Sequence, residues 1–364
     1  MRTDQQTAHT HAVGSTRTAS AGGHRHGLSE VEAALAVLRG EYDAAIVHLD
    51  ARIAALEASE PPPPPPPDGA TVRVTSVPAL LAALADDANA EIVVANGTYK
   101  IPGASSSAGQ SGQGLWIDER FAGRTRPVLV RAETKHGVTF DGGGATYWIG
   151  LHFIGGAHDQ TWQGFRFANA EPTGVGFIDF GGFVGHDPVR NITVRDCILT
   201  GFQGAVGNQG HAVYISHAFG GRHKGITLDG LLIEDTIGNV GGGIHIYHDT
   251  YSDKVPDYWN AEDVTIRNCT IRGVLVGFYV WAKTARNVLV EDCRVENARD
   301  YGVRYELGEN VTFRRVTTTG SGAEGIAPTY YMPGGPYRYP SIPELGPDGV
   351  PGPKLVTFEA CDFR

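Results

Sequence analysis

The sequence is poor in charged residues, and the shortage falls on basic ones. Charged residues make up 19% of the 364 residues, and the formal net charge is −10. A negative field of this kind disfavours binding to nucleic acid or to anionic membranes. No apolar run approaches the roughly 20 residues of a membrane-spanning helix, so we expect no membrane insertion. The N-terminal stretch also lacks the apolar core of a secretory signal, and we expect synthesis in a cytosol.

Glycine and proline, by contrast, are plentiful, with 49 and 21 residues, which suits short strands and turns better than helices. Composition separates four segments. Residues 1–27 are small, polar and histidine-rich, residues 28–59 follow a helical Ala/Leu/Glu pattern, and residues 60–69 hold the proline run Pro61–Pro67. That run predicts a stiff polyproline II spacer. Residues 70–364 are rich in predicted strands.

The second segment carries apolar residues at alternating steps of three and four, with one stutter at Tyr42. They are Leu28, Val31, Leu35, Leu38, Tyr42, Ile46, Leu49, Ile53 and Leu56. This heptad seam predicts a trimeric coiled coil over residues 28–59. A single amphipathic helix packed on its own domain is the alternative.

Two His-x-His pairs precede this segment, His9 with His11 and His24 with His26. In an extended chain, both imidazoles of such a pair lie on the same side. Three chains around one axis then offer six nitrogens per pair, a set suited to iron, zinc or another first-row metal. The paired motifs ahead of a heptad stalk resemble the collar segments of bacteriophage tail fibres. A flexible histidine-rich tail without metal is the alternative.

An internal repeat defines the large domain. Short segments with alternating apolar residues recur, and their copies begin at Asn191, Gly225, Asp263, Asn287, Asn310 and Leu355. Intervals of 23 and 24 residues with one short strand per copy indicate a solenoid. The fold class predicted for residues 70–364 is therefore all-β, a right-handed parallel β-helix. The left-handed conformation that a coil corner needs suits Asn, Asp and Gly, so we expect corners where most copies begin.

All four cysteines occupy one register of this repeat. Cys197, Cys269, Cys293 and Cys361 alternate there with Leu231 and Val316. A position that accepts Cys, Leu or Val is an apolar core position, so we expect four buried, unpaired thiols. The glycosylation-like sequons at Asn191, Asn268 and Asn310 are interpreted as strand and corner residues.

The domain opens with a predicted capped helix from Ser76 to Ala85, then the strand pair within Glu91–Ile101. With the Asn-Gly-Thr-Tyr turn and the segments from Arg126 and Val138, this opening resembles the pectate-lyase-like β-helix superfamily. The resemblance covers residues 71–364. It implies the fold, and it leaves lyases, hydrolases, epimerases and non-catalytic adhesins open.

Four later coils place polar and aromatic residues on one outward face, which we call the aromatic strip. We aligned these coils from Gly210, Gly243, Gly277 and Gly302. One predicted column is Tyr214, His245, Tyr279 and Arg304; the next is Ser216, Tyr247, Trp281 and Glu306; a third places Asp249 beside Lys283. Tyr214, Tyr247, Tyr279 and Trp281 are the candidate sugar-binding residues, and the alternative is that this face is a subunit contact.

Asp249, Glu306, Lys283, Arg304 and His245 are the candidate catalytic residues. Asp249 and Glu306 suit an inverting hydrolysis, whereas the basic pair Lys283 and Arg304 resembles that of chondroitinase-B-like lyases, without the flanking residues of that family. Plain binding ranks ahead of hydrolysis and elimination, and the β-helix needs no cofactor. We interpreted the isolated histidines, including His136, His152 and His158, as ordinary surface or turn residues.

Collar, coiled coil, proline spacer and β-helix, in this order, resemble a phage tail fibre or tailspike. The resemblance implies a homotrimer in the virion tail, attached to tail or baseplate proteins through its N-terminus and facing a host surface glycan. Two alternatives remain open at this point. One is a secreted polysaccharide lyase or glycoside hydrolase, and the other is a purely structural tail component.

Overall fold

The computed structural model describes residues 69–101, 115–117, 121, 123–145, 150–170, 175–181, 187–203, 211–216, 222–237, 242–247, 261–281, 285–305, 309–321, 324–328 and 356–363. The chain divides into two compact units, residues 1–65 and 66–364, and every described residue belongs to the second. The predicted collar and coiled coil lie outside the described residues and stay predictions.

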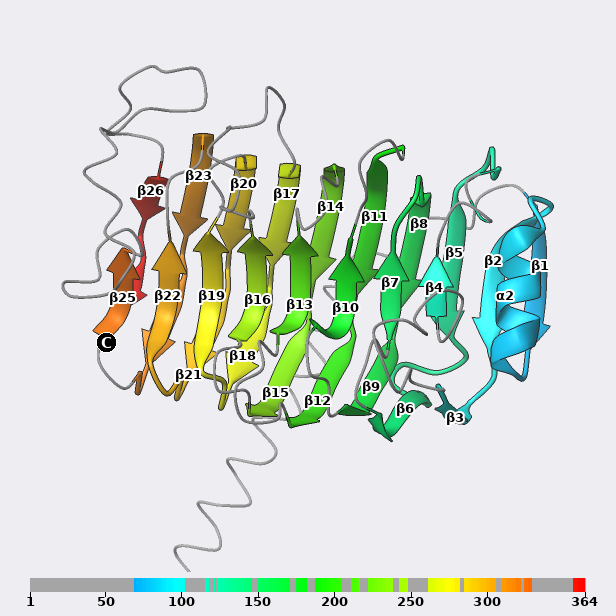
Figure 1. Cartoon of the computed structure of the whole chain (residues 1–364), viewed down its shortest axis with the longest axis horizontal. Helices are drawn as coiled ribbons and strands as arrows, with labels where there is room; N and C mark the ends of the chain where they lie inside the picture. The colour runs from blue at the N-terminus through cyan, green and yellow to red at the C-terminus, as the bar shows by residue number, and fades with distance from the viewer. Residues whose placement is uncertain are drawn as a thin grey trace, which may run out of the picture. The chain divides into compact units, whose positions relative to one another are not determined.

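The described strands form three parallel sheets, which the chain visits in turn (Figure 1). Sheet A consists of β1 (Ala70–Val74), β2 (Asn89–Val94), β5 (Val128–Ala132), β8 (His158–Gln163), β11 (Val189–Arg195), β14 (His223–Asp229), β17 (Ala261–Arg267), β20 (Ala285–Glu291), β23 (Glu309–Arg314) and β26 (Val356–Glu359). Sheet B consists of β3 (Gly97–Lys100), β6 (Val138–Ala145), β9 (Phe165–Ala170), β12 (Ile198–Gln203), β15 (Leu232–Ile237), β18 (Thr270–Arg272), β21 (Arg294–Glu296), β24 (Thr317–Thr319) and β27 (Asp362–Phe363).

Sheet C consists of β4 (Leu115–Ile117), β7 (Leu151–Phe153), β10 (Val175–Phe180), β13 (His211–Ser216), β16 (Gly242–Tyr247), β19 (Val276–Trp281), β22 (Tyr301–Tyr305) and β25 (Glu324–Pro328). Each turn of the chain adds one strand to A, then one to B, then one to C. All the strand pairs are parallel, and the predicted parallel β-helix is confirmed.

The repeat copies are successive strands of sheet A, from β11 to β26, in the predicted register. Thr193, Thr227 and Thr265 are partners in the ladder, as are Val264, Val288 and Val311. The inward residues of all three sheets form one core cluster, whose largest buried side chains are Trp162, Phe140, Phe153, Phe165, Phe167, Phe177, Phe180, Phe278 and Phe313. Packing of alternate residues from successive coils therefore holds the solenoid together.

The first residue of most copies is left-handed, as predicted, with φ of 53° at Asn191 and 55° at Asn287. Its place differs from the prediction, however, because these residues lie inside the strands of sheet A. The corner between sheets A and B falls later in each copy, at a second left-handed position that includes Asp196 and Asn268, with φ of 54° and 55°. Left-handed corner positions favour Asn, Asp and Gly, because most other side chains clash with the backbone in that conformation.

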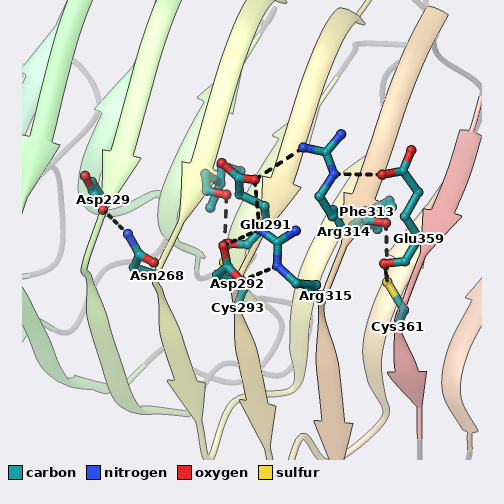
Figure 2. Close-up of polar contacts among 11 residues, drawn as sticks. Asp229, Asn268, Glu291, Asp292, Cys293, Phe313, Arg314, Arg315, Glu359 and Cys361 are labelled. Atoms are coloured by element: carbon teal, nitrogen blue, oxygen red, sulfur yellow. Dashed lines mark hydrogen bonds and ion pairs between the residues drawn. The ribbon is translucent and has the colours of Figure 1, made fainter.

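Asparagine side chains link neighbouring coils at both positions. The amide Nδ2 of Asn191 donates to Asp159 Oδ1 at 2.8 Å, and that of Asn310 donates to Asn287 Oδ1 at 2.9 Å. Asn268 Nδ2 donates to Asp229 Oδ1 at 2.8 Å (Figure 2). The interpretation of the sequons as strand and corner residues is thus confirmed.

The cysteine prediction is right for three residues and wrong for the fourth. Cys197, Cys269 and Cys293 are 0%, 1% and 2% exposed, all four cysteines are free, and burial raises the pKa of the Cys197 thiol to about 12. Cys361 is only half-buried, because it lies in the last described coil and has a neighbouring coil on one side. Its Sγ lies 3.3 Å from the Phe313 carbonyl oxygen (Figure 2).

The predicted cap is helix α2 (Val77–Ala85). Ser76 is its N-cap, and its side chain accepts a hydrogen bond from the Ala79 N–H at 3.2 Å. The helix buries Leu80 and Leu84 against the first coil. Strand β1, which precedes the helix and pairs with β2, was not anticipated. Among the described residues, no helix is long and apolar enough to cross a membrane.

Candidate functional site

Small residues at one inward position in the strands of sheet C shape the candidate site. A Cβ at Gly243 would lie 2.6 Å from Ile271 Cγ2, and one at Gly277 would lie 2.4 Å from the Gly302 carbonyl oxygen. Only a small residue fits this inward position. The partner of Gly243 is Ala212, because Val213 pairs with Ile244, as the register on the buried residues of these coils predicted.

Two neighbouring residues of β13, Ala212 and Val213, both belong to the core cluster. The residues that flank them, His211 and Tyr214, lie outside that cluster, and their rings stack with centroids 4.9 Å apart and planes 5° apart. This break in alternation brings two side chains of one strand together on the outer face, which a strictly alternating strand does not do.

The columns of the aromatic strip have the predicted register. Tyr214, His245, Tyr279 and Arg304 are successive ladder partners. Tyr247 pairs with Ser216 on one side and with Trp281 on the other.

The rings of the first column are packed against one another along the sheet. His245 contacts the His211 ring at 4.1 Å between centroids and stacks on Tyr279 at 4.2 Å with planes 6° apart. The Arg304 guanidinium carbon lies 4.8 Å from the centre of the Tyr279 ring, a cation–π contact. Tyr247 stacks on Tyr214 at 5.8 Å. The outer face of sheet C therefore carries a continuous stack from His211 to Arg304.

Most of this stack is closed to solvent, which corrects the expectation of an open aromatic strip. Tyr214, His245 and Tyr279 are 6%, 2% and 7% exposed, although they do not belong to the core cluster. Tyr247 and Arg304 are half-buried. In this form, only the half-buried members present surface to a ligand or to a second subunit.

His211 and His245 form a buried imidazole pair. His245 Nδ1 lies 2.9 Å from His211 Nε2. Burial lowers the pKa of His211 to about 3, and burial, with the nearby His211 and Arg304, lowers the pKa of His245 well below its usual value. Both rings are therefore neutral near neutral pH. A buried imidazole of low pKa is a weak base and holds no proton to donate, so His245 suits hydrogen bonding better than general acid–base catalysis.

A second buried polar pair lies on the same face in the two preceding coils, on β7 and β10. His152 Nε2 is 2.8 Å from Asp179 Oδ2, and the two side chains are 8% and 4% exposed. Asp179 is the ladder partner of both His152 and Tyr214, so the pair extends the first column backwards. Gly181 lies against the pair, since a Cβ there would be 2.6 Å from His152 Nε2.

This pair corrects the interpretation of His152 as a surface or turn residue. His158 is also buried, at 7%, and its Nδ1 lies 2.7 Å from Asp159 Oδ2. His136 does lie in a turn, with φ of 61°. The sequence held one usable signal for Asp179, because it alternates with the apolar residues Ile178 and Phe180 as Tyr214 does with Val213 and Ile215.

Several predicted site residues lie outside the described residues. They are Asp249, Lys283 and Glu306 of the catalytic candidates and His9, His11, His24 and His26 of the metal candidates. Trp281 ends β19, but its side chain is outside the description. Within the described part of the chain, no group of three or more His, Cys, Asp or Glu side chains is placed to hold a metal ion.

Comparison with known proteins identifies the fold family. The model of the family described as "Right handed beta helix region" matches residues 150–332, just over half of the chain. The chain belongs to this family. The match supplies the hand of the solenoid and, with the strand ladders, confirms the predicted fold class. A search of curated proteins finds no match.

Solved structures match this chain at low identity. A PL6 family alginate lyase, AlyGC, is 13% identical, with a TM-score of 0.30 over 73% of this chain and 41% of the lyase. The Geobacillus virus E2 protein ORF18 is 13% identical, with a TM-score of 0.30 over 70% of this chain and 54% of that one.

The catalytic unit of an α-1,3-glucanase from Streptomyces thermodiastaticus is 15% identical, with a TM-score of 0.23 over 78% of this chain and 64% of that one. The chain thus spans less than two thirds of the length of each of these three structures. The likeness concerns the fold alone.

Proposed function

We propose that the β-helix recognises a host surface polysaccharide through the outer face of sheet C. The observation that carries the proposal is the aromatic stack from His211 to Arg304, which the fold itself does not require. Tyrosine rings stack on sugar rings, and a fixed cation binds hydroxyl or acidic groups. An extended column along successive coils suits an extended polymer.

The outer faces of the other two sheets serve as a contrast. On sheet A, Arg267 is paired with Asp229 at 2.8 Å and Arg314 with Glu359 at 2.7 Å. On sheet B, Arg272 is paired with Glu234 at 2.6 Å. Charged groups that are already paired with neighbouring coils are less available to bind a ligand, so sheet C is the favoured binding face.

The half-buried residues make the first contact in this proposal. Tyr247 lies over Tyr214, and Arg304 lies over Tyr279 and within 5.8 Å of the Tyr301 ring centre. An arginine held against aromatic rings loses little freedom when it binds. Binding without cleavage ranks first, because Asp179 is the one carboxylate whose side chain is described on this face, it is paired with His152, and inverting hydrolysis needs two carboxylates. Hydrolysis through Asp249 and Glu306 ranks second, and elimination through Lys283 and Arg304 third.

Within this proposal, the chain is a phage tail fibre or tailspike. Residues 28–59 would trimerise, residues 1–27 would attach the fibre to tail or baseplate proteins, and the β-helix would meet the host cell surface. A secreted lyase or hydrolase is the second candidate. It shares the solenoid and the glycan face but does not need the heptad seam or the His-x-His pairs.

Retention of the full chain on an array of bacterial surface polysaccharides tests the glycan proposal. We expect Arg304→Met to weaken retention by about 10- to 100-fold, since a charge-assisted hydrogen bond is lost. Arg267→Met, a matched arginine on sheet A, should leave retention unchanged. Absence of any retained glycan would favour a purely structural role, and release of shortened or unsaturated fragments would favour an enzyme.

Sedimentation of the full chain, compared with a chain that starts at Asp68, tests the tail-fibre proposal. We expect a trimer that loses its assembly with residues 1–67. Metal analysis of the trimer should find stoichiometric iron, zinc or another first-row metal, released below about pH 6 as the imidazoles protonate. A monomeric full chain contradicts the stalk, and a metal-free trimer contradicts the His-x-His site.

A further inference from the structure

Buried polar atoms on the outer face of sheet C lack partners. Among the described residues, none hydrogen-bonds to Asp179 Oδ1, His211 Nδ1 or His245 Nε2, although each atom is closed to solvent. The three residues are 3%, 1% and 2% exposed. A buried polar atom without a partner costs about 1–3 kcal/mol, so three of them together are a substantial cost on one face of three adjacent strands.

The fold does not need these groups at these positions. On the outer face of sheet A, the central column consists mostly of threonines, including Thr193, Thr227 and Thr265, with Leu129 and Leu289 in two of its coils. Apart from Asp179, the carboxylates in the ion pairs of the described coils have side chains that are 12% or more exposed. Asp179 is buried at 4% against a histidine. A structural role alone does not account for this placement.

The chemistry of the histidine pair defines what it offers to a ligand. Each neutral imidazole has one N–H and one lone pair. The contact between His245 Nδ1 and His211 Nε2 uses one N–H and one lone pair. Whichever tautomers are present, the two remaining nitrogens supply one donor and one acceptor. Asp179 Oδ1 adds a second acceptor on the strand next to His211.

We infer that Asp179, His211 and His245 form a subsite for adjacent hydroxyl groups of a sugar or another polyol. A hydroxyl donates and accepts at once, so two or three neighbouring hydroxyls satisfy the carboxylate oxygen and both ring nitrogens. Strands β10, β13 and β16 are neighbours in sheet C, and a spacing of roughly 4.8 Å per strand places the groups within reach of one or two sugar units.

The Tyr214 and Tyr279 rings, stacked on these histidines, hold both imidazoles in place. The subsite rests on the proposed glycan function and specifies it, because it selects hydroxyl-rich units. Since the three atoms are buried, the ligand binds to a form in which this part of the outer face is uncovered.

Two variants of the full chain test the subsite. Asp179→Asn keeps the size of the side chain and replaces the charged acceptor. The double variant His211→Phe with His245→Phe keeps the ring stack and removes both nitrogens that lack partners. The probe is the polysaccharide that the unaltered chain retains most strongly on the array, titrated calorimetrically. We expect each variant to lose about 10- to 100-fold in affinity.

Thermal unfolding separates the subsite from a structural role. Replacing two polar partners by apolar groups of the same shape is close to neutral or stabilising, so the double variant should unfold at the same or a higher temperature. Asp229→Asn on sheet A is the matched carboxylate control and should bind as the unaltered chain does.

If the unaltered chain binds a glycan and both variants bind it within about twofold, the subsite is wrong and the proposed function stands. If the double variant binds normally but unfolds at a lower temperature, the pair is structural and the subsite is again wrong. A chain that retains no polysaccharide of the array overturns the function and the subsite together.

Discussion

The polar side chains on the outer faces of sheets A and C find their partners in different ways. On sheet A and the corner that follows it, polar residues pair along the solenoid axis. Arg315 contacts Asp292 at 2.6 Å and Glu291 at 3.3 Å, and Arg314 contacts Glu359 at 2.7 Å (Figure 2). On sheet C, the groups are rings and a buried carboxylate, and three polar atoms have no described partner. Sheet A also holds buried atoms without a described partner, including Gln160 Nε2 and Arg195 Nε, but these lie among paired charges. The three atoms of sheet C lie on adjacent strands, among aromatic and imidazole rings, which indicates a ligand site.

Both faces carry titratable groups, but they respond to acid over different ranges of pH. The pKa of the Glu133 carboxyl is lowered from 4.5 to about 2, chiefly by the hydrogen bond from Arg73. Its contribution to stability is present above about pH 4.5 and is lost as the pH falls toward 2. The pKa of buried His211 is lowered from 6.5 to about 3, so its effect begins at milder pH.

The largest expected effect is therefore acid sensitivity of sheet C. Below pH 6.5, His211 binds a proton in the unfolded chain but not in the folded chain. Its contribution to the free energy of unfolding is therefore fully present above that pH and is lost as the pH falls toward 3. At about pH 5, the loss from His211 alone is roughly 2 kcal/mol. His245, faced by His211, Tyr279 and Arg304, adds to it. Thermal unfolding between about pH 7.5 and 5 measures the loss.

The double variant His211→Phe with His245→Phe isolates that effect. It should lose much less stability than the unaltered chain over the same interval, because phenylalanine binds no proton in either state. An equal loss in the two proteins would assign the acid sensitivity to other groups and weaken the contrast between the faces.

The smallest expected effect is on the sheet A ladder. Arg267 and Asp229 have side chains 46% and 21% exposed, and solvent screens such a pair. Arg267→Met should cost less than about 1 kcal/mol in thermal unfolding at neutral pH. Asp229 keeps its hydrogen bond from Asn268 at 2.8 Å. A loss well above this value would mean that the ion pairs of sheet A are a major source of stability, which would contradict the expected order of the two faces.

The repeat could be predicted from the sequence because each copy carries the same short-range pattern of residues. Apolar residues two apart, asparagine or glycine at left-handed positions and one cysteine register all repeat along the chain, and they predicted the strands of sheet A and the register of Tyr214 with His245. The cap helix followed from Ser76 and the apolar residues behind it, since capping is also a short-range signal.

Three features of the site were not predictable in this way. Ala212 and Val213 both lie in the core, which breaks strict alternation, so His211 was not recognised as an outward residue. His152 and Asp179 lie 27 residues apart, and only the ladder makes them neighbours. The burial of Tyr214 and Tyr279 depends on packing beyond their own strands.

The sequence by itself determined the solenoid, its cap and which residues share a column, because these depend on periodicity and on the conformational preferences of single residues. Only the tertiary structure decided which outward residues are buried and which polar atoms lack partners. Those properties arise from the contacts of each side chain with strands from other coils, and no local pattern encodes them.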